Sequence, residues 1–217
     1  MGPGRINATS TLICISAAEL LPKARVRLQR QMQYARVLER GGNRASGLQN
    51  WLDEAYDCIG ALAQPRIALR PVQASIHHSG VQIAGHTQVE NPTLAEDVAS
   101  GGTVTAYLVT LGFSQTAAFE WLNGDYGAHH VQSDLSNEVL FELGRIAHRK
   151  QRQQNAGARL KRISVQANDV CGKVWDPQKV QSLLSVFDGA GLDVSVTDTG
   201  CFQPLNSLLG LTVSRVS

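Results

Sequence analysis

The chain is organised around one uncharged stretch, TVTAYLVTLG, residues 103–112. It is rich in Val, Thr and Tyr, which are residue types that favour strands. Because its apolar residues do not simply alternate with charged ones, both faces of the strand should be covered. We therefore predict that Thr103–Leu111 forms a buried central strand, and that Gly112 ends it.

Strand-like and turn-like segments precede this central stretch. Arg66–Arg70 is predicted to be a strand. Ser75–His77 and Val81–Ile83 flank Ser79-Gly80, which is typical of a hairpin. Asn91-Pro92-Thr93 then opens a short helix. A hairpin makes part of the sheet antiparallel, so the mixed order of elements predicts the α+β class.

Helices dominate the segment after the central strand. Apolar residues at helical spacing predict a long helix over Tyr126–Asn155, after a shorter one over Ser114–Leu122. A helix is expected to start at Pro177. The remaining predicted strands are Arg159–Val165, Leu192–Thr197 and Leu208–Val216.

The N-terminal part is predicted to be helical. Ser16 and Glu19 fit a capping box, and Pro22 should restrict the helix to a short first turn followed by a longer helix ending at Gly41-Gly42. A second helix should cover Ser46–Leu62. The expected organisation is a helical arm over residues 1–64 and a curved α+β domain over residues 65–217, with a twisted, mainly antiparallel sheet.

Composition narrows the class of protein. Hydrophobic residues make up 43% of the 217 residues and charged residues 18%, which excludes an intrinsically disordered chain. No membrane span and no signal peptide are expected, so we predict a cytoplasmic protein. Its four cysteines form no CxxC pair and are expected to be reduced thiols.

Two segments carry most of the positive charge. Lys23–Arg40 holds six Lys and Arg against one acid, and Arg145–Arg162 holds seven against none. The favoured interpretation is two solvated helix faces, and an anionic partner is the alternative. A nucleic-acid binder is the least favoured class, because Tyr34 is the only aromatic residue in these segments that is available for base stacking.

Common catalytic and metal-binding motifs are missing from the sequence. There is no P-loop, GxGxxG, GxSxG or HExxH. The adjacent His77 and His78 would point to opposite faces of a strand, which argues against a joint metal site. Asp134 and Glu138 form a like-charge pair one helical turn apart, and a solvated acidic edge is the favoured interpretation.

The second half of the chain, about Arg66 to Val216, nevertheless resembles a known family. Its short motifs follow one another in the order Tyr107–Gly112, Gly124-Asp125-Tyr126, Arg162-Ile163-Ser164, Trp175–Val180, Val196-Thr197-Asp198 and Pro204. This order and spacing are similar to those of the reactivation domain of cobalamin-dependent methionine synthase, including its stand-alone relatives.

The resemblance implies a function and a set of site residues. Members of that family bind S-adenosylmethionine, dock over the corrinoid of a partner domain and help to restore methylcobalamin. Arg162 would contact a carboxylate or a corrinoid amide, and Asp198 would hold the amine of the ligand. The site residues that the resemblance implies are Arg162, Ser164, Gly172, Asp198, Cys201, Pro204, Asp125 and Tyr126.

The sequence departs from the family at one segment of this site. Val165-Gln166-Ala167-Asn168 stand where the family has Pro-Gly-Tyr, which removes a close-approach backbone and an aromatic ring. Two hypotheses stay open. The chain is either an accessory protein that reactivates a corrinoid-dependent methyltransferase with S-adenosylmethionine, or a non-catalytic partner of a corrinoid protein or methyltransferase subunit. Cys171 and Cys201 are interpreted as small core residues, with a redox or cobalt-facing role as the alternative.

Overall fold

The computed structural model describes residues 10–77, 80–85, 87–155, 158–163 and 177–216. The side chains of residues 158–163 and 216 are outside that description. The elements are β1 (Thr11–Cys14), α1 (Ala17–Arg30), α2 (Met32–Arg40), α3 (Gly42–Leu62), β2 (Arg66–Val72), β3 (Ala74–His77), β4 (Gly80–Ile83), β5 (Thr87–Val89), α4 (Pro92–Ala99), β6 (Thr103–Thr110), α5 (Gln115–Trp121), α6 (Tyr126–Gln154), β7 (Ala158–Ile163), α8 (Pro177–Leu184), the 3-10 helix η1 (Ser185–Phe187), β8 (Ser195–Val196), β9 (Phe202–Gln203) and β10 (Ser207–Val216).

The main sheet is antiparallel throughout and has the strand order β1-β2-β6-β10-β7. Strand β6 is its middle strand, which confirms the prediction for Thr103–Leu111. Two small sheets, β3-β4-β5 and β8-β9, lie beside it, and the first contains the predicted hairpin. The α+β class is confirmed.

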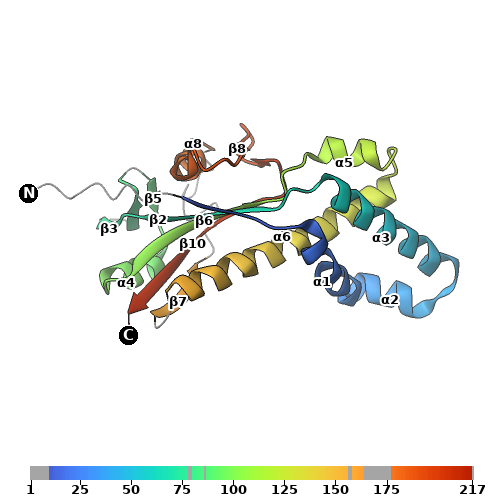
Figure 1. Cartoon of the computed structure of the whole chain (residues 1–217), viewed down its shortest axis with the longest axis horizontal. Coiled ribbons are helices and arrows are strands. Elements are labelled where there is room, and N and C mark those ends of the chain that lie inside the picture. The colour runs from blue at the N-terminus through green and yellow to red at the C-terminus, as the bar shows by residue number, and fades with distance from the viewer. Residues whose placement is uncertain (1–9, 78–79, 86, 156–157, 164–176, 217) are drawn as a thin grey trace, which may run out of the picture.

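Helices and small elements cover both faces of the main sheet (Figure 1). Alternate residues of β6 point to opposite faces, so Tyr107 and Val109 join one core while Ala106 and Leu108 join the other. The first core is completed by α1, α3 and α6. The second is completed by α4, α8, η1 and the β3-β4-β5 sheet.

Helix α6 connects the two ends of the molecule. It passes under the sheet at one end and packs against α1 and α3 at the other (Figure 1). Its residues Val131, Leu135, Val139 and Leu143 are buried, as the helical spacing predicts. None of the described helices is long and apolar enough to cross a membrane.

The N-terminal region differs from the prediction in two ways. Helix α1 continues through Pro22, and the break comes instead at Gln31, whose extended backbone separates α1 from α2. Strand β1, which was not predicted, precedes the helices and pairs with β2 along the edge of the main sheet. The division of the chain at residue 64 stays a prediction.

The predicted strand over Leu192–Thr197 is also too long. Only Ser195 and Val196 pair, with Gln203 and Phe202 of β9. The alternation of Leu and Val with polar residues is real, but the segment lies over the sheet rather than within it, where Leu192, Val194 and Val196 pack against the second core.

Candidate functional site

A cleft of about 530 Å³ opens at the end of β6, and we refer to it as the β6 cleft. Its walls come from three parts of the chain: the start of β2, the turn between β6 and α5, and the segment between η1 and β10. The residues that line it are Gln64, Arg66, Thr110, Gly112, Phe113, Ser114, Leu192, Asp193, Ser195, Gln203 and Pro204.

The turn at the end of β6 is fixed by backbone geometry. Gly112 has φ +75°, and a Cβ at this position would lie 3.3 Å from the Gln64 carbonyl oxygen. The Gly112 amide donates to Thr110 Oγ1 at 3.1 Å, and the Gln64 amide donates to the Leu111 carbonyl at 2.8 Å. A glycine is therefore needed here for the β2 and β6 ends to meet at the cleft.

One wall of the cleft is basic. Arg66 Nη1 donates to the Gly191 carbonyl at 3.1 Å, and Arg66 Nη2 donates to Gln64 Oε1 at 2.8 Å. These two contacts hold the guanidinium in place and leave it further N–H donors, since the group carries five. Asp193 brings a carboxylate into the same lining. The cleft thus offers one cationic and one anionic group.

Hydrogen bonds join two strands next to the cleft. Ser207 Oγ lies 2.9 Å from Thr110 Oγ1 and 2.8 Å from the Pro204 carbonyl oxygen. These contacts tie the start of β10 to the end of β6, and they fix Pro204 at the rim. The hydroxyls of Ser114 and Ser195 and the amide of Gln203 add exposed hydrogen-bonding groups to the lining.

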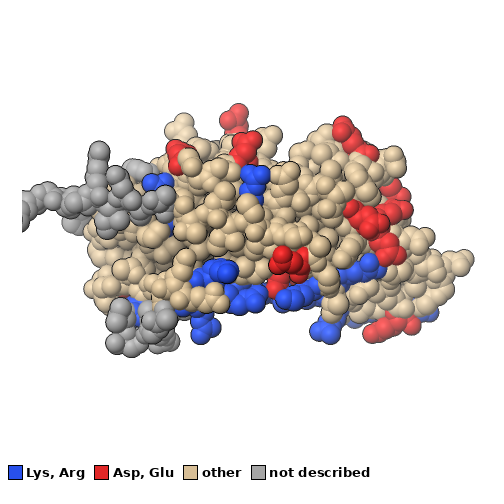
Figure 2. Space-filling model, in the orientation of Figure 1, with Lys and Arg blue, Asp and Glu red and all other residues tan. Residues whose placement is uncertain are grey.

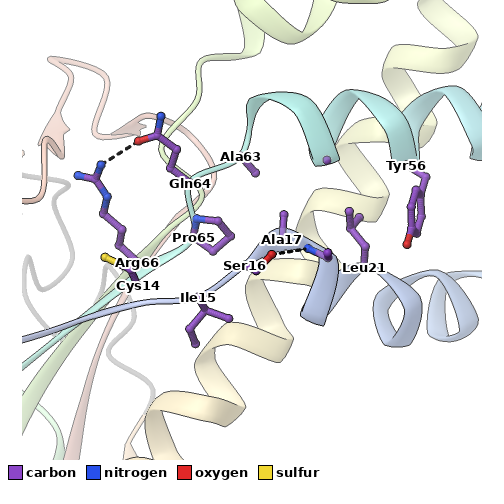
Figure 3. A pocket seen from close by; sticks show the side chains of 12 residues that line it. Cys14, Ile15, Ser16, Ala17, Leu21, Tyr56, Ala63, Gln64, Pro65 and Arg66 are labelled. Carbon is purple, nitrogen blue, oxygen red and sulfur yellow. Dashed lines mark hydrogen bonds between the residues drawn. The ribbon is translucent and has the colours of Figure 1, made fainter.

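A second cavity, of about 440 Å³, adjoins the first (Figure 3). It lies between β1, the start of α1 and the end of α3, and Cys14 and Tyr56 are among its lining residues. Gln64 and Arg66 line both cavities. Figure 3 shows their hydrogen bond, so this pair forms the boundary between the two.

The described site residues that the resemblance implies do not lie together in the structure. Pro204 lines the β6 cleft, as do Thr110 and Gly112 of the Tyr107–Gly112 motif. Asp198 and Cys201 are exposed in the turn between β8 and β9, outside that lining, so the interpretation of Cys201 as a core residue is wrong. The backbone amide of Cys201 donates to Thr197 Oγ1 at 3.1 Å, which shapes this turn.

Asp125 and Tyr126 lie at the start of α6, and neither lines the β6 cleft. The Ala128 amide donates to Asp125 Oδ1 at 3.0 Å, and this hydrogen bond holds the pKa of the Asp125 carboxyl below its ordinary value. Asp125 is thus the N-cap of α6. Tyr126 is 80% exposed, and its ring contacts Phe119.

The remaining site residues that the resemblance implies are described only in part or lie outside the described residues. Arg162 lies in β7, where its backbone pairs with Thr212, and its side chain is outside the description. Ser164, Gly172 and Cys171 are outside the described residues, as is the segment that replaces Pro-Gly-Tyr. Among the described residues, no group of three His, Cys, Asp or Glu is placed to hold a metal ion.

Sequence reasoning did not select Arg66 and Asp193, the two charged residues that line the cleft. Arg66 begins a strand, and Asp193 occupies a polar position in an alternating segment, so each is accounted for locally as a solvated side chain. The one sequence feature that could have drawn attention to Asp193 is Gly191, two residues before it, because glycine often marks a turn. In the structure Gly191 has φ +74° and the chain turns there.

Comparison with known proteins supports the fold. The chain matches a crystal structure of the MetH reactivation domain bound to AdoHcy, with a TM-score of 0.59 and 15% sequence identity. The match covers 96% of this chain and 79% of that chain. No protein-family model matches the sequence, and no curated protein matches it either. At this identity, the likeness shows a shared fold.

Proposed function

We propose that this chain is an accessory protein of a corrinoid-dependent methyltransferase, and that it binds S-adenosylmethionine in the β6 cleft. The fold and the lining of the cleft support this proposal. The fold is that of a reactivation domain whose crystal structure contains AdoHcy. The single observation that carries the proposal is that Arg66 and Asp193, a cation and an anion, both line one cleft on that fold.

The cleft matches the chemistry of the ligand. S-adenosylmethionine carries a carboxylate and an ammonium on its amino-acid end, and ribose hydroxyls on its nucleoside end. The fixed Arg66 guanidinium suits the carboxylate, and the Asp193 carboxylate suits the ammonium. Ser114, Ser195 and Gln203 provide partners for the hydroxyls. A volume of about 530 Å³ is in the normal range for small-molecule sites.

In the proposed reaction the protein positions the methyl donor and does not itself form a bond with it. The methyl group would pass as a cation from S-adenosylmethionine to a Co(I) corrinoid held by a partner protein in the cytoplasm, S-adenosylhomocysteine would leave, and a separate one-electron reductant would supply the Co(I) state. The cofactor supplies the chemistry, and the residues of the cleft orient the methyl donor and balance its charges. The resemblance assigns the ligand amine to Asp198 and a carboxylate or corrinoid amide to Arg162. These roles are the alternative to those of Asp193 and Arg66 within the same proposal.

A second candidate keeps the fold and the partner but not the ligand. Phe113 is the only aromatic residue among the described residues of the lining, and it is 6% exposed. Its ring is therefore packed in the core and offers little surface to a ligand. The tyrosine that the family has in Pro-Gly-Tyr is also missing from this sequence. A protein that binds a corrinoid protein or methyltransferase subunit as a scaffold or chaperone would need no such ring.

Calorimetric titration with S-adenosylmethionine and with S-adenosylhomocysteine tests the proposal. Arg66→Met and Asp193→Asn should each weaken binding about 10- to 100-fold, because each removes a charge-assisted hydrogen bond. Arg44→Met and Asp188→Asn are matched controls, since both residues are exposed and lie outside the cleft. Both controls should bind like the unaltered protein.

The same titration separates the two candidates. Saturable binding that depends on Arg66 and Asp193 supports the methyl-donor site. No heat with either ligand, in the presence or absence of hydroxocobalamin, overturns it and leaves the scaffold function. Binding that is lost in Asp198→Asn but kept in Asp193→Asn would show that the ligand amine is held from the β8–β9 turn instead.

A further inference from the structure

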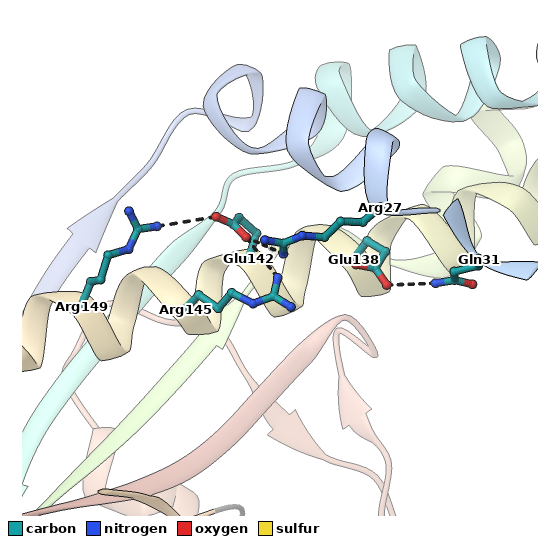
Figure 4. Close-up of polar contacts among 6 residues, drawn as sticks. All are labelled: Arg27, Gln31, Glu138, Glu142, Arg145 and Arg149. Atoms are coloured by element: carbon teal, nitrogen blue, oxygen red, sulfur yellow. Dashed lines mark hydrogen bonds and ion pairs between the residues drawn. The ribbon is translucent and has the colours of Figure 1, made fainter. Parts of the chain in front are cut away.

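A third concave site lies between α1 and α6, away from the β6 cleft. It has a volume of about 580 Å³ and is lined by Lys23, Arg27, Glu142, Arg145, His148 and Arg149. We call it the arginine groove. Figure 2 shows a belt of Lys and Arg along this face of the molecule, and Figure 4 shows three of the arginines reaching toward one carboxylate.

Glu142 organises the groove. Its side chain is 5% exposed and accepts a hydrogen bond from Arg27 Nη1 at 2.6 Å. Arg145 Nη1 lies 3.1 Å from the same oxygen, and Arg149 Nη2 lies 3.6 Å from the other. A single buried carboxylate therefore gathers guanidinium groups from two helices, and it fixes their positions before any ligand arrives.

The charges of the groove do not balance. Of the described lining residues, Glu142 is the only acid, and it faces three arginines and Lys23. Glu138, one helical turn away, accepts a hydrogen bond from Gln31 at 2.9 Å and adds a second carboxylate to this face. The cations still outnumber both carboxylates. Cations held this close to one another repel, and an anion placed between them relieves the repulsion.

The arginines keep donors for a ligand. The exposed fractions of their side chains are 35% for Arg27, 47% for Arg145 and 60% for Arg149. Each guanidinium has five N–H donors in a planar fork, and the contacts with Glu142 use only part of them. Such forks bind phosphate oxygens in pairs. Arg145 and Arg149 are one turn apart on α6, as Lys23 and Arg27 are on α1.

From this arrangement we infer that the arginine groove binds the diphosphate group of a small ligand. Each helix contributes two cations at i, i+4 spacing, which suits two adjacent phosphate groups lying between the helices. The described lining contains no Phe, Tyr or Trp side chain for base stacking, which argues against a single-stranded nucleic acid. The inference is independent of the function proposed for the β6 cleft, because the two cavities share no residue.

Calorimetric titration of the full chain with inorganic pyrophosphate tests the inference. The unaltered protein should bind saturably and more tightly than it binds inorganic phosphate, and added salt should weaken the binding. The double variant Arg145→Gln/Arg149→Gln should lose at least about tenfold in affinity, since it removes two charge-assisted contacts and leaves the Arg27–Glu142 contact in place.

The matched control is Lys150→Gln/Arg152→Gln. It makes the same change in net charge on the same helix, and both residues are exposed and lie outside the groove. This control should bind pyrophosphate like the unaltered protein, and urea unfolding should confirm that both double variants are folded. Equal losses in the two double variants would overturn the inference, because diffuse charge would then explain the binding. No saturable binding of pyrophosphate, or binding only of polyuridylate or an acidic protein, would overturn it as well.

Discussion

The middle of the main sheet contains a close contact that a single methyl group should disrupt. Gly210 of β10 pairs with Tyr107 of β6, and the Tyr107 ring lies over the glycine. A Cβ at position 210 would lie 2.6 Å from Tyr107 Cε1 and closer still to Cζ and Oη. Carbon atoms in contact normally lie about 3.5–4.0 Å apart, so the overlap is about 1 Å.

The ring cannot move away freely, because Tyr107 is 3% exposed and belongs to the first core. Forcing an extra methyl group into a packed core costs about 1–3 kcal/mol, and the lower backbone entropy of alanine in the unfolded chain offsets part of this. We expect Gly210→Ala to lower the free energy of unfolding by about 2 kcal/mol. For a chain of this length, Tm should fall by about 4–8 °C.

Urea and thermal unfolding measure this effect, and a second background isolates its cause. In a Tyr107→Leu protein, Gly210→Ala should cost less than about 0.5 kcal/mol, because the ring is no longer there. Gly47→Ala is the control, since a Cβ at this position in α3 meets nothing within 4 Å and should be neutral or stabilising. Equal losses for Gly210→Ala in both backgrounds would refute the steric explanation.

Other features of the structure give predictions of their own. Glu142→Gln should lower the free energy of unfolding in urea by about 1–3 kcal/mol, because it removes the carboxylate that joins α1 to α6; an unchanged urea midpoint would contradict this. Burial, and then the hydrogen bond to the Asp134 carboxylate and its charge, raise the pKa of Tyr34 above its ordinary value. The unfolded pKa is about 10 and the folded pKa lies above it, so the stability that Tyr34 adds relative to Tyr34→Phe should be complete below about pH 10 and should fall as the pH rises further. Urea unfolding of both proteins at pH 8 and pH 11 checks this, and an equal change of the urea midpoint in the two proteins would contradict it. Burial raises the pKa of the Cys58 thiol to about 11, so iodoacetamide at pH 8 should label the exposed Cys14 and leave Cys58 unmodified in peptide mass maps, and equal labelling would exclude this.

The elements that were predicted correctly carry strong local patterns. Thr103–Leu111 is uncharged and rich in strand-forming residues, and it forms the middle strand, where both faces are covered. In α6, apolar positions recur with helical period, and Val131, Leu135, Val139 and Leu143 among them are buried. In both cases the local preference and the tertiary environment agree, so the sequence alone was enough.

The elements that were missed lack such agreement. Strand β1 has four residues, of which only Ile13 is even partly buried, and its pairing with β2 is set by the sheet edge rather than by its own pattern. Pro22 was expected to interrupt α1 near its start. Instead Leu20, Leu21 and Ala24 are buried around it, and this packing holds the helix together across the missing hydrogen bond.

The charged pair of the β6 cleft could not be predicted for a different reason. Arg66 and Asp193 are far apart in the sequence, and nothing in the spacing of either residue indicates a partner. Both line the cleft because β2 begins beside the end of β6, and because the chain after η1 returns to the same edge, where the Gly191 carbonyl accepts from Arg66. This proximity depends on the topology of the whole sheet.

The motifs of the family resemblance that lie at the cleft are those that shape the backbone. Gly112 and Pro204 line it, and both serve the backbone: Gly112 allows the turn after β6, and the Pro204 carbonyl is tied to Ser207 at the start of β10. Asp198, which the resemblance assigns to the ligand, lies outside the lining. Motifs that a fold requires can persist at 15% identity whatever the ligand is, so they indicate the fold and leave the ligand to the side chains. For this reason the dependence of binding on Arg66 and Asp193, rather than the presence of the motifs, decides between a methyl-donor site and a scaffold.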